Sequence, residues 1–298
     1  MTGVKGVRIA IGLVMCLIGA SGTMAAGSDT PIFVGIFEDI EPGNLSPGMA
    51  KPHVRVAFQY RSGTWAPMAG GYPGAVTWTV VLDGKRIGSI ASRQGPHPVY
   101  LGGDVGIQEI TTGAASIPRV RKGAAGFSYT GNNARTRPLL LVSAPRFHDP
   151  DGWKPTALSA DEKQVAIQRF RKRVPSLEQC NDPDGVQVHL VPYLDDEIVF
   201  AKAYRSKDGR VLFGESLSSE RSKCDFFDDP TFFDYWFMLK DGVVQFLDTQ
   251  MTPLEAADIE GTGRSQWVFQ TSRGEDRDGY ELFYDDFSKN VSFSWEYH

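Results

Sequence analysis

Short apolar runs, many of them alternating with polar residues, cover most of the chain and predict β-strands. The clearest alternation lies at residues 54–60. Three further pairs of runs each flank an Asp-Gly dipeptide: 75–82 with 85–90, 198–204 with 211–217, and 235–239 with 243–247. Asp-Gly supplies the positive φ angles that a tight two-residue hairpin requires. We therefore predict a mainly β, antiparallel fold.

One segment departs from this pattern and predicts an amphipathic helix. Ser159 and Glu162 have the spacing of a capping box, and Pro175 ends the segment. Val165, Phe170 and Val174 are expected to form its apolar stripe. Its other positions carry many cations: Lys163, Arg169, Arg171, Lys172 and Arg173. These cations fit either a site for an anion or acidic partner, or a solvated helix face.

The first 26 residues have the three parts of a signal peptide. Lys5 and Arg8 make the start basic, residues 9–19 are almost continuously apolar, and small residues follow at 21–26. The apolar run is shorter than the ~20 residues that span a bilayer. We expect a periplasmic or secreted protein with no membrane span once the signal is removed.

Charge and cysteine content agree with export. The chain carries 31 Lys and Arg against 36 Asp and Glu, and losing Lys5 and Arg8 makes the net charge −7. This acidic balance argues against nucleic acid as a partner. Cys16 lies in the signal, so Cys180 and Cys224 remain, and in an oxidising compartment they predict a disulfide.

The segment 254–298 carries the most specific pattern. Asp258 and Glu260 stand two residues apart in a loop with Gly261 and Gly263, and apolar runs follow. The segment resembles one FG-GAP blade of the integrin-alpha type. That family's loop binds calcium through acids at alternate positions, so the resemblance makes Asp258 and Glu260 candidate calcium ligands. Gln266 stands where the family has its last acid, so only two carboxylates remain, and the loop fits either a weak calcium site or a turn without metal.

The resemblance implies a propeller-like or related sheet assembly. The chain also resembles secreted proteins of Gram-negative bacteria to which no activity is assigned, and this implies export but transfers no catalytic residue. We predict a signal peptide at 1–26, an N-terminal β region at 27–143, a helix-containing connection at 144–183 and a C-terminal β region at 184–298. Alternatively, 144–183 is an insertion within a single unit.

No linear catalytic motif is present. The five histidines have no zinc-site spacing, and the chain has no GxSxG or P-loop. His148 beside Asp149 is the best local acid–base pair, and Asp195–Glu197 offers neighbouring carboxylates. Asp-Pro-Asp-Gly at 149–152 and 182–185 fits a turn or a cation contact. The aromatic and acidic residues of 224–236 fit a sugar-binding groove or a core.

These observations leave two functions open. The first is a non-catalytic binding or scaffolding module for an envelope protein or a glycan. The alternative is a cell-envelope hydrolase whose loop carboxylates meet only in the folded chain. The sequence does not decide whether the protein is an enzyme, and calcium is its one candidate cofactor.

Overall fold

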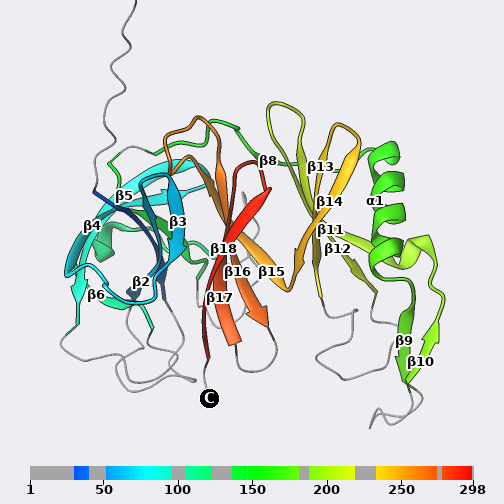
Figure 1. The fold of residues 1–298 in the computed structure, drawn as a ribbon, viewed down its shortest axis with the longest axis horizontal. Helices are drawn as coiled ribbons and strands as arrows, with labels where there is room; N and C mark the ends of the chain where they lie inside the picture. Colours follow the sequence, from blue (N-terminus) through cyan, green and yellow to red (C-terminus); the bar gives the residue numbers. More distant parts are fainter. Residues whose placement is uncertain are drawn as a thin grey trace, which may run out of the picture.

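The computed structural model describes residues 30–39, 52–95, 105–121, 136–145, 147–180, 188–218, 233–273 and 277–296. In these residues the chain forms antiparallel sheets that stack in series, with one α-helix at one end of the stack (Figure 1). The prediction of a mainly β, antiparallel fold with one helix is confirmed. The predicted signal peptide lies outside the described residues.

The first sheet closes on itself. Its strands are β1 (Ile32–Glu38), β2 (His53–Arg61), β3 (Thr64–Pro67), β4 (Ala75–Leu82), β5 (Lys85–Gln94), β6 (Ile107–Thr112) and β7 (Leu139–Val142). Their order is β1-β7-β4-β5-β6-β2-β3, and β1 also pairs with β2. We call it the closed sheet. A short 3₁₀ turn, Ala114–Ser116, follows β6.

The second sheet is a four-stranded meander made by the segment that resembles a propeller blade. Its strands are β15 (Met251–Ala257), β16 (Gln266–Arg273), β17 (Arg277–Tyr284) and β18 (Lys289–Glu296), paired in chain order. We call it the central sheet, because other layers cover both of its faces. Phe293 and Trp295 of β18 are buried against the closed sheet.

The third sheet follows the helix in sequence. Its order is β14-β13-β12-β11-β8, with β8 at Lys154–Pro155, β11 at Ile198–Arg205, β12 at Val211–Leu217, β13 at Tyr235–Lys240 and β14 at Val243–Thr249. We call it the outer sheet. A separate pair, β9 (Leu177–Cys180) and β10 (Val188–Val191), lies beyond α1 (Figure 1). A 3₁₀ turn at Asp195–Glu197 precedes β11.

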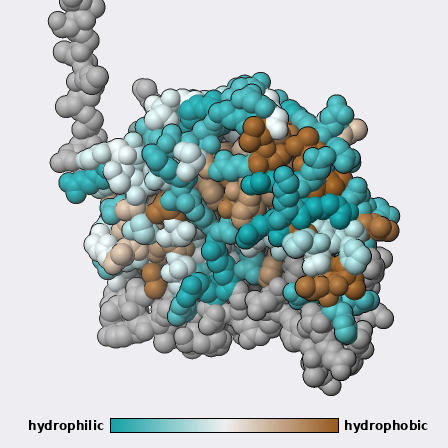
Figure 2. Space-filling view, turned by 45° about the vertical axis from the view of Figure 1, so that its right-hand side comes forward, coloured by the Kyte–Doolittle hydropathy of each residue, from teal (hydrophilic) through white to brown (hydrophobic). Residues whose placement is uncertain are grey.

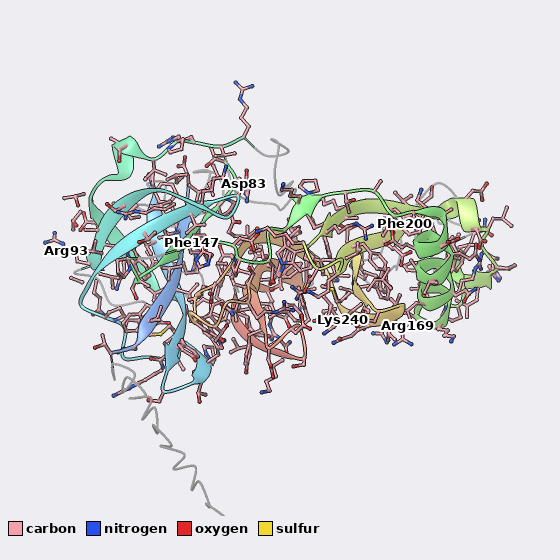
Figure 3. The ribbon with its side chains drawn as sticks, turned by 90° about the horizontal axis from the view of Figure 1, so that it is seen from above. Asp83, Arg93, Phe147, Arg169, Phe200 and Lys240 are labelled. Atoms are coloured by element: carbon pink, nitrogen blue, oxygen red, sulfur yellow. The ribbon has the colours of Figure 1, made fainter. Side chains whose placement is uncertain are left out.

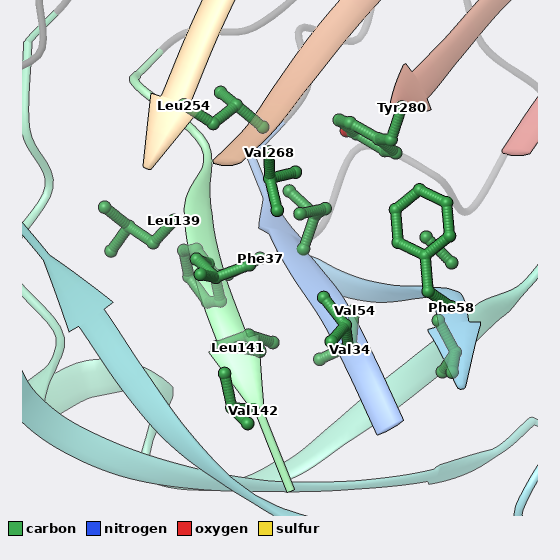
Figure 4. Packing of buried hydrophobic residues seen from close by; sticks show 14 of the residues in the cluster. Val34, Phe37, Val54, Phe58, Leu139, Leu141, Val142, Leu254, Val268 and Tyr280 are labelled. Atoms are coloured by element: carbon green, nitrogen blue, oxygen red, sulfur yellow. The ribbon is translucent and has the colours of Figure 1, made fainter. Parts of the chain in front are cut away.

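Three apolar cores separate these layers. The first joins the closed sheet to the central sheet, where Leu254, Val268 and Tyr280 face residues such as Val34 and Phe58 (Figure 4). The second, rich in tryptophan, joins the central sheet to the outer sheet. The third lies between the outer sheet and α1. The region boundaries predicted at 143 and 183 stay a prediction. Strand β8, which lies in the predicted connection 144–183, pairs with β11 of the outer sheet.

Two of the three Asp-Gly hairpins form as predicted. Asp83-Gly84 and Asp241-Gly242 are two-residue turns in which both residues have positive φ. The third differs, because β11 ends at Arg205 and β12 begins at Val211, which leaves a five-residue loop. In that loop the Asp208 carboxylate accepts hydrogen bonds from its own neighbours and holds the wider turn closed.

Helix α1 spans Ala160–Arg173 and begins with the predicted capping box. The Ser159 hydroxyl accepts from the Glu162 amide, and the Glu162 carboxylate accepts from the Ser159 amide at 2.8 Å. Phe170 and Val174 are buried as expected, but the prediction for Val165 was wrong, since its side chain is 38% exposed. Ala166 is buried instead, because it lies one turn before Phe170 on the same side.

We expect Phe170→Ala to lower the free energy of unfolding by about 3–5 kcal/mol, because its ring is fully buried between Tyr193, Tyr235 and Phe237. Val165→Ala on the same helix is the matched control and should change stability by less than about 0.5 kcal/mol. Urea unfolding of both variants measures the difference. Equal losses would contradict the orientation of α1.

Candidate functional site

The loop of the blade-like segment is closed by its own hydrogen bonds. The Asp258 carboxylate accepts from the amides of Gly261 at 2.8 Å, Thr262 at 3.0 Å and Gly263 at 2.8 Å. The Gln266 side-chain oxygen accepts from the Ile259 amide at 2.7 Å. In the described part of the chain, no group of three or more His, Cys, Asp or Glu residues is placed to hold a metal ion.

The second candidate calcium ligand, Glu260, has its own partner. Its carboxylate accepts a hydrogen bond from the indole nitrogen of Trp65 in the closed sheet. Burial raises the pKa of Glu260, while the Trp65 bond lowers it. The structure thus places Asp258 and Glu260 in one loop but shows their carboxylates bound to protein donors, and the calcium site stays a prediction.

His148 and Asp149 are neighbours in sequence, but the structure does not join their side chains. The Asp149 carboxylate accepts from the amides of Gly152 at 3.0 Å and Trp153 at 2.7 Å, which is turn chemistry. The side chain of His148 is exposed, and its carbonyl accepts a hydrogen bond from the Asp258 amide. The second Asp-Pro-Asp-Gly, at 182–185, lies outside the described residues.

Charged side chains from four connections and from the end of β13 meet where the outer and central sheets adjoin. The cluster consists of Asp151, Asp208, Arg210, Lys240, Arg264 and Asp286, with Arg210 at its buried centre. Burial alone would raise the pKa of Asp208, but hydrogen bonds from Ser206 and Arg210 hold it well below its usual range. The cluster contains three cations and three carboxylates. Its charges therefore balance, and its ion pairs hold the connecting loops together.

Sequence reasoning missed this cluster because its members come from distant turns. Arg210 contacts Asp151 at 2.8 Å across 59 positions of the chain and also contacts Asp286. The only local signal is Asp208 two residues before Arg210, and such spacing is common in ordinary turns.

The other acidic candidates also have structural partners. Asp195 accepts from Arg171 Nε at 3.0 Å, and Glu197 accepts from the Leu194 amide at 2.6 Å. Of the aromatic and acidic segment 224–236, residues 224–232 lie outside the described residues, while Tyr235 and Trp236 are buried. Because Cys224 belongs to that part, the disulfide with Cys180 stays a prediction.

Glu215 is an acid that sequence reasoning did not single out. It lies on β12 between Phe213 and Leu217, facing the core beneath α1, and is fully buried. Among the described residues neither of its carboxylate oxygens has a hydrogen-bond partner. Burial alone raises the pKa of Glu215 to about 8, so the side chain is mostly protonated at neutral pH.

The end of the molecule built from α1, β9, β10 and the outer sheet carries the exposed apolar side chains. We call it the helix end. In the described residues, all large hydrophobic side chains that are exposed belong to it: Val165, Leu190, Leu194, Val199 and Val243. Figure 2 shows the face turned toward this end, where brown apolar patches interrupt a hydrophilic surface.

Cations of α1 lie over aromatic rings at the border of this end. Lys163 Nζ is 5.6 Å from the Phe200 ring centre, and Arg173 Cζ is 4.5 Å from that of Phe246. Arg171 stacks over Tyr193 at 4.6 Å. Their alkyl stems cover the rings and keep the charges at the surface. The apolar groups left uncovered are therefore aliphatic.

No family model matches the chain, and neither a curated protein nor a solved structure is similar to it at a significant level. The likeness to an FG-GAP blade accordingly stays a prediction. Of the helices in the described part of the chain, none combines the length and apolar character that crossing a bilayer requires.

We expect melting curves recorded with calcium and with EGTA to superimpose. Both oxygens of Asp258 already accept amide hydrogen bonds, and Glu260 is bound to Trp65, so an ion would have to displace these donors. Differential scanning calorimetry of the full chain makes the comparison. A melting temperature that rises with calcium concentration would establish the ion instead.

We expect stability to fall as pH rises from about 4.5 to 8, in part because of Glu215. The pKa of Glu215 is higher in the folded than in the unfolded chain. Its contribution to the free energy of unfolding is therefore largest at low pH, where the group is protonated in both states, and is lost as the pH rises toward 8. The full effect is on the order of 5 kcal/mol.

Glu215→Gln should remove this part of the pH dependence, as measured by urea unfolding between pH 5 and 8. Burial also raises the pKa of Glu255, to about 7, against the opposing effect of Arg137. Glu255 is present in both proteins, so the difference between their curves of stability against pH comes from residue 215. Parallel curves would show that Glu215 does not titrate in this range.

Proposed function

We propose that this chain is an exported, non-catalytic binding module whose helix end docks another protein of the cell envelope. One observation carries the proposal: in the described residues, the exposed large apolar side chains all lie at the helix end. Exposed apolar groups that are concentrated in one part of a molecule favour a protein contact there. Export rests on the signal-like residues 1–26.

A protein fits this surface better than a glycan does. Sugars are held by stacking on open aromatic faces, whereas Tyr193 is buried and Phe200 and Phe246 lie under cations. The uncovered groups are Leu and Val, including Leu190 at 69% exposed. Aliphatic side chains of this kind gain most by packing against other apolar side chains.

The acids that the sequence singled out support a binding role over the hydrolase alternative. Asp149, Asp258 and Glu197 each accept backbone amide hydrogen bonds that close a turn. A general acid or base needs a carboxyl group within reach of a substrate proton. These carboxylates instead fix the loops of the fold.

We expect a photo-crosslinking residue at Leu194 to capture one abundant envelope protein in cells of the source organism. Arg93 in β5 is the control position, since it is exposed and Figure 3 places it at the opposite end of the molecule from Arg169 on α1. Mass spectrometry of the crosslinked product identifies the partner. The proposal fails if positions 190, 194 and 243 capture nothing beyond what position 93 captures.

A further inference from the structure

One flank of α1 carries Val165, Arg169, Lys172 and Arg173, which we call the basic stripe. Val165 and Arg173 each lie four residues from Arg169, and Lys172 lies three residues from it, so these side chains share one side of the helix, beside the buried positions Ala166 and Phe170. All four are exposed. The stripe therefore presents three cations and one apolar group within just over two turns.

No carboxylate of the described residues neutralises the cations of the basic stripe. In the described residues, neither Arg169, Lys172 nor Arg173 forms an ion pair with a carboxylate. By contrast, Arg171 on the same helix pairs with Asp195, and Arg205 pairs with Glu162 at 2.8 Å. The chain as a whole has a net charge of −5, so this positive patch differs from its surroundings.

The basic stripe borders strand β14, because Arg173 lies over the ring of Phe246. Val243 of that strand points to the other face of the outer sheet, since it lies opposite Lys240, whose side chain pairs with Asp286 beside the central sheet. Figure 3 shows Arg169 on the same side of the molecule as Lys240, which ends β13 just before the turn into β14. Among the described strands β14 pairs only with β13, so it is an edge of the outer sheet.

We propose that the basic stripe binds an acidic segment of the partner protein, in which carboxylates alternate with apolar side chains. This inference rests on the proposed function and names the chemistry of its partner. Carboxylates of such a segment meet Arg169, Lys172 and Arg173, where a guanidinium offers two parallel donors. An apolar side chain of the segment meets Val165.

A protein segment fits better than an anionic membrane or a nucleic acid. A polyanion larger than the stripe would also meet the acidic remainder of the surface, and charges interact over about 8–10 Å at physiological salt. A short segment touches the stripe alone. The exposed Val165 also finds an apolar partner in a peptide but none along a phosphate backbone.

The first test uses the purified full chain and a fluorescent peptide that alternates glutamate with leucine and serine. Arg169→Glu together with Lys172→Glu should weaken its binding by about tenfold, and the affinity of the unchanged protein should fall as salt is added. The matched control is Lys85→Glu together with Arg86→Glu, two exposed cations at the start of β5. It should bind as the unchanged protein does.

Three outcomes would overturn the inference. The first is equal binding of the same peptide with glutamine in place of glutamate. The second is an equal loss in both double variants. The third is that phosphatidylglycerol vesicles or single-stranded DNA, and not the peptide, lose binding when the stripe is reversed. Thermal melting by circular dichroism checks that both variants fold, which we expect because the substituted side chains are exposed.

A second measurement separates this inference from the proposed function. The crosslinker at Leu194 is introduced into the protein that carries Arg169→Glu and Lys172→Glu. Loss of the crosslink, with an acidic segment mapped on the partner, supports the inference. An unchanged crosslink leaves the binding module standing and shows that the partner is not held by acids. No crosslink in the unchanged protein contradicts the proposed function itself.

Discussion

The central sheet has to be apolar on both faces, and the rest of the molecule is arranged around this requirement. Trp267, Val268 and Phe269 follow one another in β16, and successive side chains of a strand point to opposite faces. Trp267 and Phe269 therefore enter the core shared with the outer sheet, while Val268 enters the core shared with the closed sheet. A lone four-stranded sheet with these strands would expose two apolar faces, so both neighbouring layers are needed to bury them.

Polar contacts fix how the layers are oriented. Glu255 of the central sheet accepts from the amides of Asp83 at 2.7 Å and Gly84 at 3.0 Å, and so holds the β4–β5 turn. Arg137 bonds to this same carboxylate, and Tyr280 bonds to Glu38 of the closed sheet. Buried ionic groups add little net stability once their desolvation is counted, but leaving one unpaired is costly, so these contacts penalise other orientations of the layers. Glu215 avoids the cost of a buried charge in another way, because its raised pKa keeps it mostly protonated at neutral pH.

Local signals predicted the elements better than their arrangement. Alternation and the Asp-Gly dipeptides predicted the hairpins, and Ser159 with Glu162 predicted the start of α1. Each of these signals depends on residues only a few positions apart. The pairing of β1 with both β2 and β7 joins segments far apart in sequence, and no local pattern encodes it. The same limit hid the Arg210 cluster. The sequence predicted that Val165 is buried, but an apolar residue can lie on the exposed flank of a helix as well as in the core. The packing of Phe170 sets the orientation of α1 and leaves Val165 exposed.

The layered arrangement bears on the proposed docking at the helix end. The central sheet is covered on both faces by other layers, whereas the outer sheet has an edge strand beside α1. Among the described strands, β14 has one neighbour, and β8 covers β11 only at Tyr204 and Arg205. An open strand edge flanked by apolar groups such as Val243 can pair with the same edge of another copy of the chain. Like charges beside the edge oppose such pairing. The cations of α1 beside β14 supply that charge, because two copies would bring like charges together. In the proposed complex the same cations bind an acidic segment, so one set of side chains would both oppose self-association and select the partner.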